Sequence, residues 1–545
     1  MIKRRKKELM KKQVNFLLAI LLSLTVLVGY PIQDNIGQAA DNAVTSESEY
    51  TIDGLRALIE QFRESGDIKN KGIAQAIHSH INNFERDYNK GDVEKARKRL
   101  DKIISFVQQQ QKSGNISQHA GNTIDEYASK LLTEEEELAF DVDRAYETIR
   151  ALSVDIGPRA PGSLQEKHAA HYLKSQFEQL GYDVSIQEFG IRDTLKIQLT
   201  VNGEEYPLGT ASGSAQTDEN GVTGKLYDAG LGLPENFTED AKGKIALIQR
   251  GENTFNEKVQ NAIDAGAIGA IIYDNVDSLS PLRPSLSIDS TIPVVGMRKD
   301  DGEALVSQIQ DNEVEANLYV KTQTNQTSQN VIAVKKPENV ENPEIVYITA
   351  HYDSVAFSPG ANDDASGTSV VLELARLLKD LPSDKEFRFI AFGAEEIGLV
   401  GSNYYVSQLS NDEINRSIAN FQFEMLAAKH EASSYMAVNT VDGQPNAVWE
   451  YTNNVFDKLQ LNKEELILVR RGSSDHVPFH NAGIMATCFN MGTANGGLEP
   501  EYHTPFDSIE NISKERLQYS GDIIYHTIME FLENYETEGE LEEVA

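Results

Sequence analysis

Between residues 50 and 132, hydrophobic positions recur every three or four residues, which is the spacing of one face of an amphipathic helix. Short polar stretches at 90–92 and 113–115 contain glycine and separate the helical segments. The apolar residues on three such faces are Ile52, Leu55, Ile59 and Phe62; Ile73, Ile77, Ile81 and Phe84; and Val93, Ala96, Leu100, Ile103 and Val107. Residues 50–132 are therefore predicted to form a small helical bundle.

From residue 140 onward, short apolar and β-branched runs alternate with segments of helical spacing. Helices are expected over 145–152 and 165–180, and strands over 184–189, 331–334, 345–350, 387–392, 419–424 and 485–490. Apolar runs of this length are typical of strands that are buried on both faces. The alternation predicts an α/β fold with a mostly parallel mixed sheet flanked by helices, built from residues 140–194 and 326–535.

Residues 195–325 interrupt this alternation with a segment that has its own β-rich pattern. Strands are expected within 243–251, 269–275 and 292–295, and a helix over 255–265. The same segment carries no cluster of reactive side chains. It is therefore predicted to be an inserted domain that covers a site or contacts a partner.

The first 39 residues have the pattern of a secretory signal peptide. Five consecutive basic residues precede an apolar run over 16–28, and small residues at Gly37 and Ala39 fit a cleavage site. An uncleaved anchor is the alternative, but the apolar run is shorter than the roughly 20 residues that span a bilayer. We expect a secreted protein, cleaved near Ala39, without a stable membrane anchor.

The chain of 545 residues carries a net charge of −34, so its surface is expected to repel nucleic acid and anionic lipid. It contains one cysteine, Cys488, within an apolar run, so an intrachain disulfide is excluded. Cys488 is expected to be a small buried residue and not a nucleophile.

Residues that bind metals follow the predicted strands. His351 follows one strand, Glu395 and Glu396 follow a second, Glu424 ends a third, and His503 lies in a later loop. Because the carboxyl ends of parallel strands meet at one edge of a sheet, these side chains are expected to converge. Taken singly, acids here could cap helices. Imidazole together with several carboxylates suits zinc or another divalent ion.

Four motifs carry a resemblance to a known family. They are H-Y-D-S at 351–354, G-A-N-D-D-A-S-G at 360–367, A-E-E-I-G-L-V-G-S at 394–402 and Y-H-T-P-F-D at 502–507. Together they resemble the M28 family of dizinc peptidases, with similarity from Ala145 to Glu533. The segment 195–325 resembles the protease-associated (PA) domain, and the helical segment resembles small helical modules of secreted Gram-positive proteins.

The resemblance implies two zinc ions per chain. Asp363 would bridge them, His351 and Glu424 would bind one, and Glu396 and His503 the other, although the assignment of each acid to an ion stays open. The family commonly has aspartate where this chain has Glu424. The resemblance thus implies that Glu424→Asp is tolerated.

The resemblance also implies roles around the metals. Glu395 would be the general base, Asp353 would orient His351, and Tyr502 would hydrogen-bond the developing oxyanion. Members of the family often have a cis peptide bond after the bridging aspartate, so Asp363–Asp364 is expected to be cis.

The implied function is a secreted metallo-aminopeptidase that acts on the N-termini of peptides or proteins. A carboxypeptidase on the same scaffold stays open because Arg470 and Arg471 could bind a substrate carboxylate. A non-catalytic binding protein on a peptidase fold is the second alternative. His476 and His480 are expected to line the site without binding metal.

Overall fold

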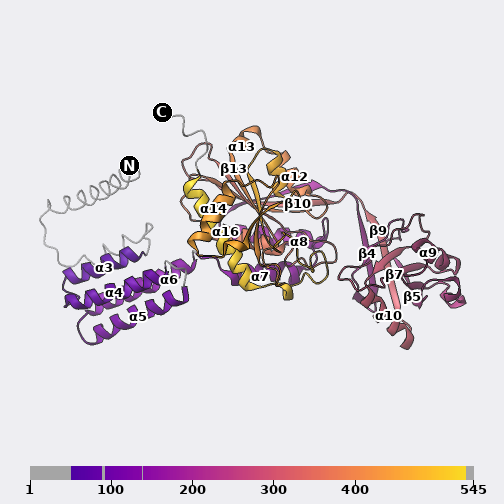
Figure 1. Cartoon of the computed structure of the whole chain (residues 1–545), viewed down its shortest axis with the longest axis horizontal. Coiled ribbons are helices and arrows are strands. Elements are labelled where there is room, and N and C mark those ends of the chain that lie inside the picture. The colour runs from indigo at the N-terminus through magenta and orange to yellow at the C-terminus, as the bar shows by residue number, and fades with distance from the viewer. Residues whose placement is uncertain (1–50, 89–92, 138, 536–545) are drawn as a thin grey trace. The chain divides into compact units, whose positions relative to one another are not determined.

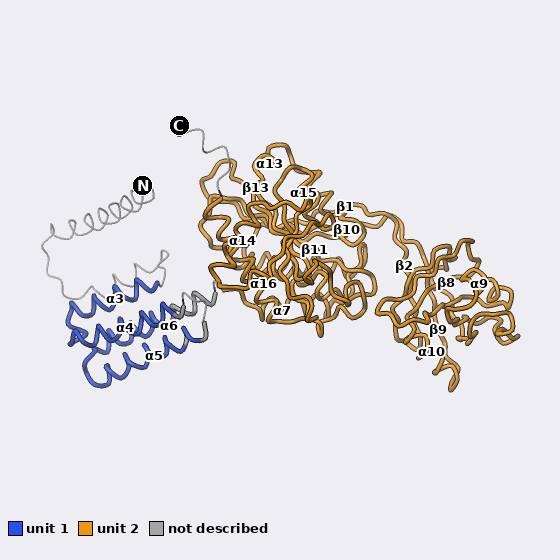
Figure 2. Tube along the Cα trace, viewed as in Figure 1, with its two compact units in different colours: residues 1–134 blue, residues 135–545 orange. Residues whose placement is uncertain are grey.

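The computed structural model describes residues 51–88, 93–137 and 139–535. The chain divides into two compact units, residues 1–134 and 135–545, which are coloured separately in Figure 2. The segment expected to be a signal peptide lies outside the described residues. Within the described ranges, no helix is long and apolar enough to cross a membrane.

The first unit is helical, as the hydrophobic spacing predicts. Its helices are α3 (Ile52–Glu64), α4 (Lys71–Tyr88), α5 (Val93–Lys112) and α6 (Gln118–Glu137). Leu55, Ile59, Ile77, Ile81 and Ile103 are completely buried between them. Thr51 caps α3 by accepting a hydrogen bond from the backbone N–H of Gly54 at 2.9 Å. The predicted helical module is therefore present.

The second unit contains an eight-stranded mixed sheet with the order β1-β10-β12-β11-β13-β16-β14-β15. These strands are β1 (Asp183–Gly190), β10 (Thr327–Lys335), β11 (Ile345–His351), β12 (Glu386–Phe392), β13 (Ser417–Glu424), β14 (Tyr435–Thr440), β15 (Leu466–Arg470) and β16 (Ala486–Gly492). The central strands β12, β11, β13 and β16 run parallel, and β1, β10 and β14 make antiparallel pairs. The predicted α/β sheet is confirmed, and β14 and β15 are additional strands.

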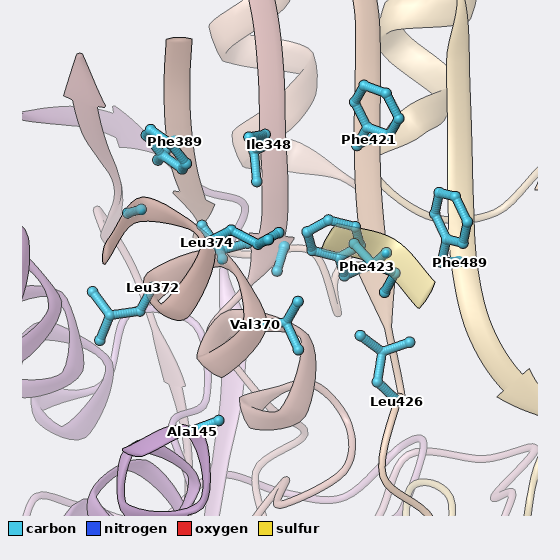
Figure 3. Packing of buried hydrophobic residues seen from close by; sticks show 14 of the residues in the cluster. Ala145, Ile348, Val370, Leu372, Leu374, Phe389, Phe421, Phe423, Leu426 and Phe489 are labelled. Carbon is cyan, nitrogen blue, oxygen red and sulfur yellow. The ribbon is translucent and has the colours of Figure 1, made fainter. Parts of the chain in front are cut away.

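Helices are packed around this sheet, and most of them are labelled in Figure 1. They are α7 (Val142–Arg150), α8 (Leu164–Gln179), α11 (Ala365–Leu378), α12 (Val400–Ser407), α13 (Asn411–Arg416), α14 (Ala447–Lys458), α15 (His476–Asn481) and α16 (Lys514–Asn534). Helix α11 is buried along almost its whole length. Figure 3 shows Val370 and Leu374 of α11 facing Ile348 of β11 and Phe423 of β13, in the core that supports the strand ends.

Residues between β1 and β10 form the insert, which has its own eight-stranded sheet in the order β3-β2-β9-β5-β6-β7-β8-β4. Its elements are β2 (Thr194–Val201), β3 (Glu204–Glu205), β4 (Gly209–Thr210), β5 (Val222–Asp228), β6 (Ile245–Gln249), α9 (Phe255–Asp264), β7 (Gly269–Tyr273), β8 (Val294–Met297), α10 (Lys299–Asp311) and β9 (Glu315–Gln323). The chain leaves the first sheet after Gly190 and returns at Thr327, so two adjacent crossings connect the sheets.

Candidate active site

Three neighbouring parallel strands deliver the predicted residues to one edge of the sheet. Thr349 of β11 pairs with Gln422 of β13, so two residues later both strands end level, at His351 and Glu424. On the other side of β11, His351 pairs with Phe392, the last residue of β12. The buried apolar runs therefore end at a common level, and the polar residues that follow them come together.

The structure gathers the predicted ligands into two groups that share Asp363. In the first group, His351 Nε2 lies 3.1 Å from Asp363 Oδ1 and 3.5 Å from Glu424 Oε2. In the second, His503 Nε2 lies 3.2 Å from Asp363 Oδ2 and 2.8 Å from Glu396 Oε2. Asp363 thus contributes one oxygen to each group.

The ligand atoms of each group lie within 4.8 Å of one another, close enough to share one metal ion. Bonds of 2.0–2.2 Å in a tetrahedral arrangement would separate ligand atoms by about 3.3–3.6 Å, so three of the four distances given above would lengthen by a few tenths of an ångström around an ion. Asp363 Oδ2 and Glu396 Oε1 are buried and accept no hydrogen bond from the described residues, although buried polar atoms normally have partners. The donor set, two imidazoles and three carboxylates, therefore fits two divalent ions.

The electrostatic field at the site also favours positive charge. Burial is the largest single influence on the pKa of His351 and lowers it, but the carboxylates around the ring, those of Glu424 and Glu395 foremost, together raise the net pKa well above its usual value. Burial also lowers the pKa of His503, but its interactions with the carboxylates of Asp363 and Glu396 outweigh burial and raise this pKa to about 10. A field that holds protons on two histidines also attracts cations.

A carboxylate from a distant loop holds the backbone of Asp363. Its backbone N–H and that of Asn362 donate to the two carboxyl oxygens of Asp507, at 3.0 and 2.7 Å. The Asp363–Asp364 peptide bond is cis, as expected. Asp364 caps α11, because its Oδ1 accepts from the backbone N–H of Gly367 at 2.9 Å. The two adjacent aspartates therefore have different roles. Asp363 belongs to both ligand groups, and Asp364 caps the N-terminus of α11.

Glu395 lies in a sharp turn directly after β12. Ala394, the residue before it, has a left-handed φ of 57°, which is uncommon for a residue with a side chain. The fully buried Asp353 accepts from the backbone N–H groups of Glu395 and Glu396, at 3.0 and 3.2 Å. Asp353 therefore braces the turn that carries the predicted base and one predicted ligand.

Asp353 also lies beside His351, as its predicted role requires. His351 Nδ1 is 3.2 Å from the backbone carbonyl oxygen of Asp353 and 3.5 Å from its carboxylate. A proton on Nδ1 directed at these oxygens leaves Nε2 free to bind a metal.

Glu424 occupies the position where the family commonly has aspartate, and a second residue holds its longer side chain. The hydroxyl of Ser474 donates to Glu424 Oε1 at 2.7 Å, while Oε2 faces His351. Ser474 has a φ of 123°, a strained value for serine. Each oxygen of the Glu424 carboxylate therefore has a neighbour, Ser474 at Oε1 and His351 at Oε2.

Tyr502 lies against the second group. Its ring stacks on that of His503, with centroids 3.8 Å apart and an interplanar angle of 20°. Burial raises the pKa of Tyr502 above its usual range, and the carboxylates of Asp363 and Glu396 raise it further. The hydroxyl therefore stays protonated and able to donate a hydrogen bond.

The sequence did not predict supporting roles for three residues: Ser474, Asp507 and Arg159. Arg159 is completely buried, and its guanidinium donates to the backbone carbonyl oxygens of Leu152, Gly157, Tyr352, Pro359 and Gly360. It thereby ties the loop before Asp363 to the end of β11. The available signals were the stretch I-G-P-R at 156–159 for Arg159 and the last residue of the motif at 502–507 for Asp507.

The remaining candidates lie outside the two metal groups. His476 Nε2 is 3.0 Å from the backbone carbonyl oxygen of Arg471, and burial lowers the pKa of this histidine to about 4. Neither His476 nor His480 belongs to a metal-binding group among the described residues. Arg470 is exposed at the end of the edge strand β15, and Arg471 Nη2 donates to the carbonyl oxygen of Gly496 at 2.9 Å. In the part of the chain that the structure describes, neither arginine forms a hydrogen bond or an ion pair with the two groups.

An α/β sheet whose strand ends present two ligand groups joined by one aspartate has the architecture of a hydrolase that uses a pair of metal ions. The chain belongs to peptidase family M28, whose model matches residues 330–528. Models of the PA domain and the FIMAH domain match residues 216–305 and 52–133. The predicted family and the inserted PA domain are therefore confirmed.

Relatives extend over most of the chain. Aminopeptidase YwaD of Bacillus subtilis (strain 168) is 52% identical over 406 residues, which cover 74% of this chain and 88% of that protein. Aminopeptidase Y of Saccharomyces cerevisiae is 30% identical over 404 residues, covering 69% of this chain and 74% of that protein. The solved structure of BSAP, a zinc aminopeptidase from Bacillus subtilis, matches with a TM-score of 0.54 and 51% identity, over 73% of this chain and 97% of that chain.

Proposed function

We propose that the protein is a secreted aminopeptidase that uses two zinc ions to release N-terminal residues from peptides. The observation that carries the proposal is the pair of ligand groups joined by Asp363 at the strand ends. The similarity to aminopeptidases, one of them a zinc enzyme of known structure, supports both the reaction and the metal.

The metal-binding roles are distributed between the two groups. His351 and Glu424 would hold one ion, Glu396 and His503 the other, and Asp363 both. When bound, the two ions polarise the scissile carbonyl group and lower the pKa of water towards about 7.

Glu395 acts as the general base and then as the general acid. It removes a proton from the attacking water and passes it to the departing amine. Burial raises its pKa well above the usual value, against the influence of His351, and the nearby carboxylates of Glu424 and Asp475 add to the rise.

Tyr502 stabilises the charge that develops on the carbonyl oxygen. Its hydroxyl stays protonated and donates a hydrogen bond that strengthens as the oxyanion forms. Stacking on His503 fixes the direction of the ring.

The charge of the site favours a free amino terminus over a free carboxylate. Acidic side chains outnumber basic ones around the two groups, and Glu395 and Glu424 are close enough to influence each other electrostatically, so the site would attract the ammonium group of a peptide. A carboxypeptidase needs a cation to bind the substrate carboxylate, but Arg470 is exposed at the end of β15 and Arg471 donates to the carbonyl oxygen of Gly496.

The other segments have supporting roles in this proposal. Residues 1–39 direct export, 50–132 form the helical module, 140–194 and 326–535 form the catalytic domain, and 195–325 form the PA domain. The PA domain would act as a lid over the substrate or as a surface for a partner. The spans of the three matching family models support this division.

Hydrolysis of paired substrates tests the proposed function. Free aminoacyl amides and their N-acetylated forms are incubated with the enzyme, with and without a zinc chelator. We expect cleavage of the free amides alone, abolished by the chelator and restored by zinc. Equal cleavage of the acetylated set would exclude an aminopeptidase, and activity that persists after complete metal removal would exclude a metal-dependent reaction.

A further inference from the structure

Glu166 is a fully buried acid outside the two metal groups. It lies in the first turn of α8, where its Oε2 accepts a hydrogen bond from the backbone N–H of Gly162 at 2.7 Å. This contact resembles the reach of a capping glutamate towards the chain before its helix, and it accounts for one oxygen. The other oxygen accepts from the hydroxyl of Ser328 at 2.5 Å.

Nothing in the hydrogen bonds and ion pairs of the described residues gives Glu166 a cationic partner. Burial and, to a smaller extent, the negative charge of Asp353 raise its pKa to about 8. A buried carboxyl group without a cation costs free energy. A stabilising ion pair therefore does not account for the presence of an acid at position 166.

The Glu166 carboxyl group packs against the turn that carries Glu395. A Cβ atom placed on Gly393 would lie 3.0 Å from Glu166 Oε1 and 2.5 Å from Ser328 Oγ, so this backbone leaves no room for a side chain. The backbone N–H of Ala394 also interacts with the Glu166 carboxyl group. Ala394 is the residue with the left-handed φ of 57°.

Two buried acids thus face three successive backbone N–H groups. Glu166 interacts with that of Ala394, and Asp353 accepts from those of Glu395 and Glu396. A strained turn persists where its surroundings determine it from several sides. We propose that Glu166 is a positioning residue for the general base Glu395, sharing this task with Asp353. The inference rests on the proposed peptidase function.

The partners of Glu166 lie beside the two crossings to the insert. Ser328 is the second residue of β10, directly after the return crossing, and a Cβ atom on Gly162 would meet Gln326 and Ile191 of the crossings themselves. Figure 2 shows the chain passing from β1 to β2 at this point. Glu166 therefore ties the turn of Glu395 to the strands that carry the PA domain.

Replacing Glu166 with methionine tests the inference, because methionine fills a similar volume and accepts no strong hydrogen bond. We expect kcat to fall about 10- to 100-fold, with KM changed by less than about threefold and two zinc ions retained per chain, since a displacement near 1 Å has effects of this size. Glu166→Gln keeps one acceptor oxygen and is expected to retain kcat within about fivefold. Glu373→Met is the control: Glu373 is also buried and accepts a backbone N–H, from Asp141 at 2.9 Å, but its other partner is Arg376 and not the turn of Glu395.

The dependence on Glu395 separates positioning from general destabilisation. In a Glu395→Gln background, Glu166→Met is expected to lower the residual kcat by less than about twofold. Equal losses in both backgrounds, loss of zinc, or an equal fall of kcat in Glu373→Met would overturn the inference. If Glu166→Met does not fold, Ser328→Ala is tested in its place. We expect a several-fold fall in kcat for this variant, and an unchanged kcat would contradict the inference. A wild-type enzyme inactive with zinc on free aminoacyl amides would instead contradict the proposed function.

Discussion

Shortening Glu424 to aspartate is expected to weaken metal binding at one of the two positions. Glu424 Oε1 accepts a hydrogen bond from Ser474 at 2.7 Å, and Oε2 lies 3.5 Å from His351 Nε2. Removing one methylene group withdraws the carboxylate by roughly 1–1.5 Å. Aspartate can then keep one of these contacts but not both. The family resemblance alone implies that aspartate is tolerated here, and the contact with Ser474 predicts the opposite.

The size of the effect follows from the contact that is lost. A hydrogen bond to a charged group contributes about 1.5–3 kcal/mol. Since 1.4 kcal/mol corresponds to a factor of ten in a binding constant, zinc affinity at the position beside His351 is expected to fall about 10- to 100-fold. The position beside His503 keeps His503, Glu396 and Asp363 and is expected to change little.

Zinc per chain, measured after dialysis against graded chelator concentrations, tests this prediction. In Glu424→Asp, one ion is expected to be lost at about 10- to 100-fold lower chelator while the second is lost as in the wild type. Ser474→Ala is the control, because it removes the same hydrogen bond from a full-length glutamate and should give a similar shift. Adding Ser474→Ala to Glu424→Asp should then cost little more. Wild-type retention of both ions in Glu424→Asp and in Glu424→Ala would refute the reasoning and show that Glu424 is not a ligand.

Three further predictions concern single residues. Glu395→Gln should keep both zinc ions but lower kcat by at least about 10³-fold, because it removes the base alone; a parallel loss of zinc would show that Glu395 is a ligand. Tyr502→Phe should lower kcat about 10²-fold with little change in KM, and an unchanged kcat would exclude the oxyanion role. Burial raises the pKa of Asp522 to about 6, above its unfolded value near 3.9, so the free energy of unfolding decreases as pH rises through this range. Asp522→Asn should therefore raise the thermal unfolding temperature at pH 8 by more than at pH 5, and an equal change at both would contradict the pKa.

The central sheet and most of the site could be predicted because their signals are local. The strands β11, β12 and β13 are largely buried runs; β11 and β13 end in His351 and Glu424, and Glu395 lies three residues after β12. Strands β14 and β15 were missed. β15 (Leu466–Arg470) lies at the sheet edge and is only partly buried, so it does not differ from its flanking residues as clearly as a buried core strand does. β14 ends in Asn439 and Thr440, which are buried through hydrogen bonds and not through apolar character.

The supporting contacts could not be predicted, since they join residues that are distant in the chain. Asp507 reaches the backbone of Asp363 across 144 residues, and Ser474 reaches Glu424 across 50. A serine or an aspartate in a loop has many possible partners, and the fold selects one. Adjacent acids posed a related problem, because ligand and helix cap were both possible at Asp363 and Asp364. The structure assigns the cap to Asp364 and brings Asp363 into both ligand groups.

Anomalous scattering at the zinc edge, from crystals of the full chain grown with zinc, tests the central claim most directly. The account predicts two peaks about 3.5–4 Å apart. One should contact His351 and Glu424, the other Glu396 and His503, and Asp363 should contact both. A single peak, or peaks that lie away from Asp363, would contradict the shared-aspartate site on which the proposed reaction depends.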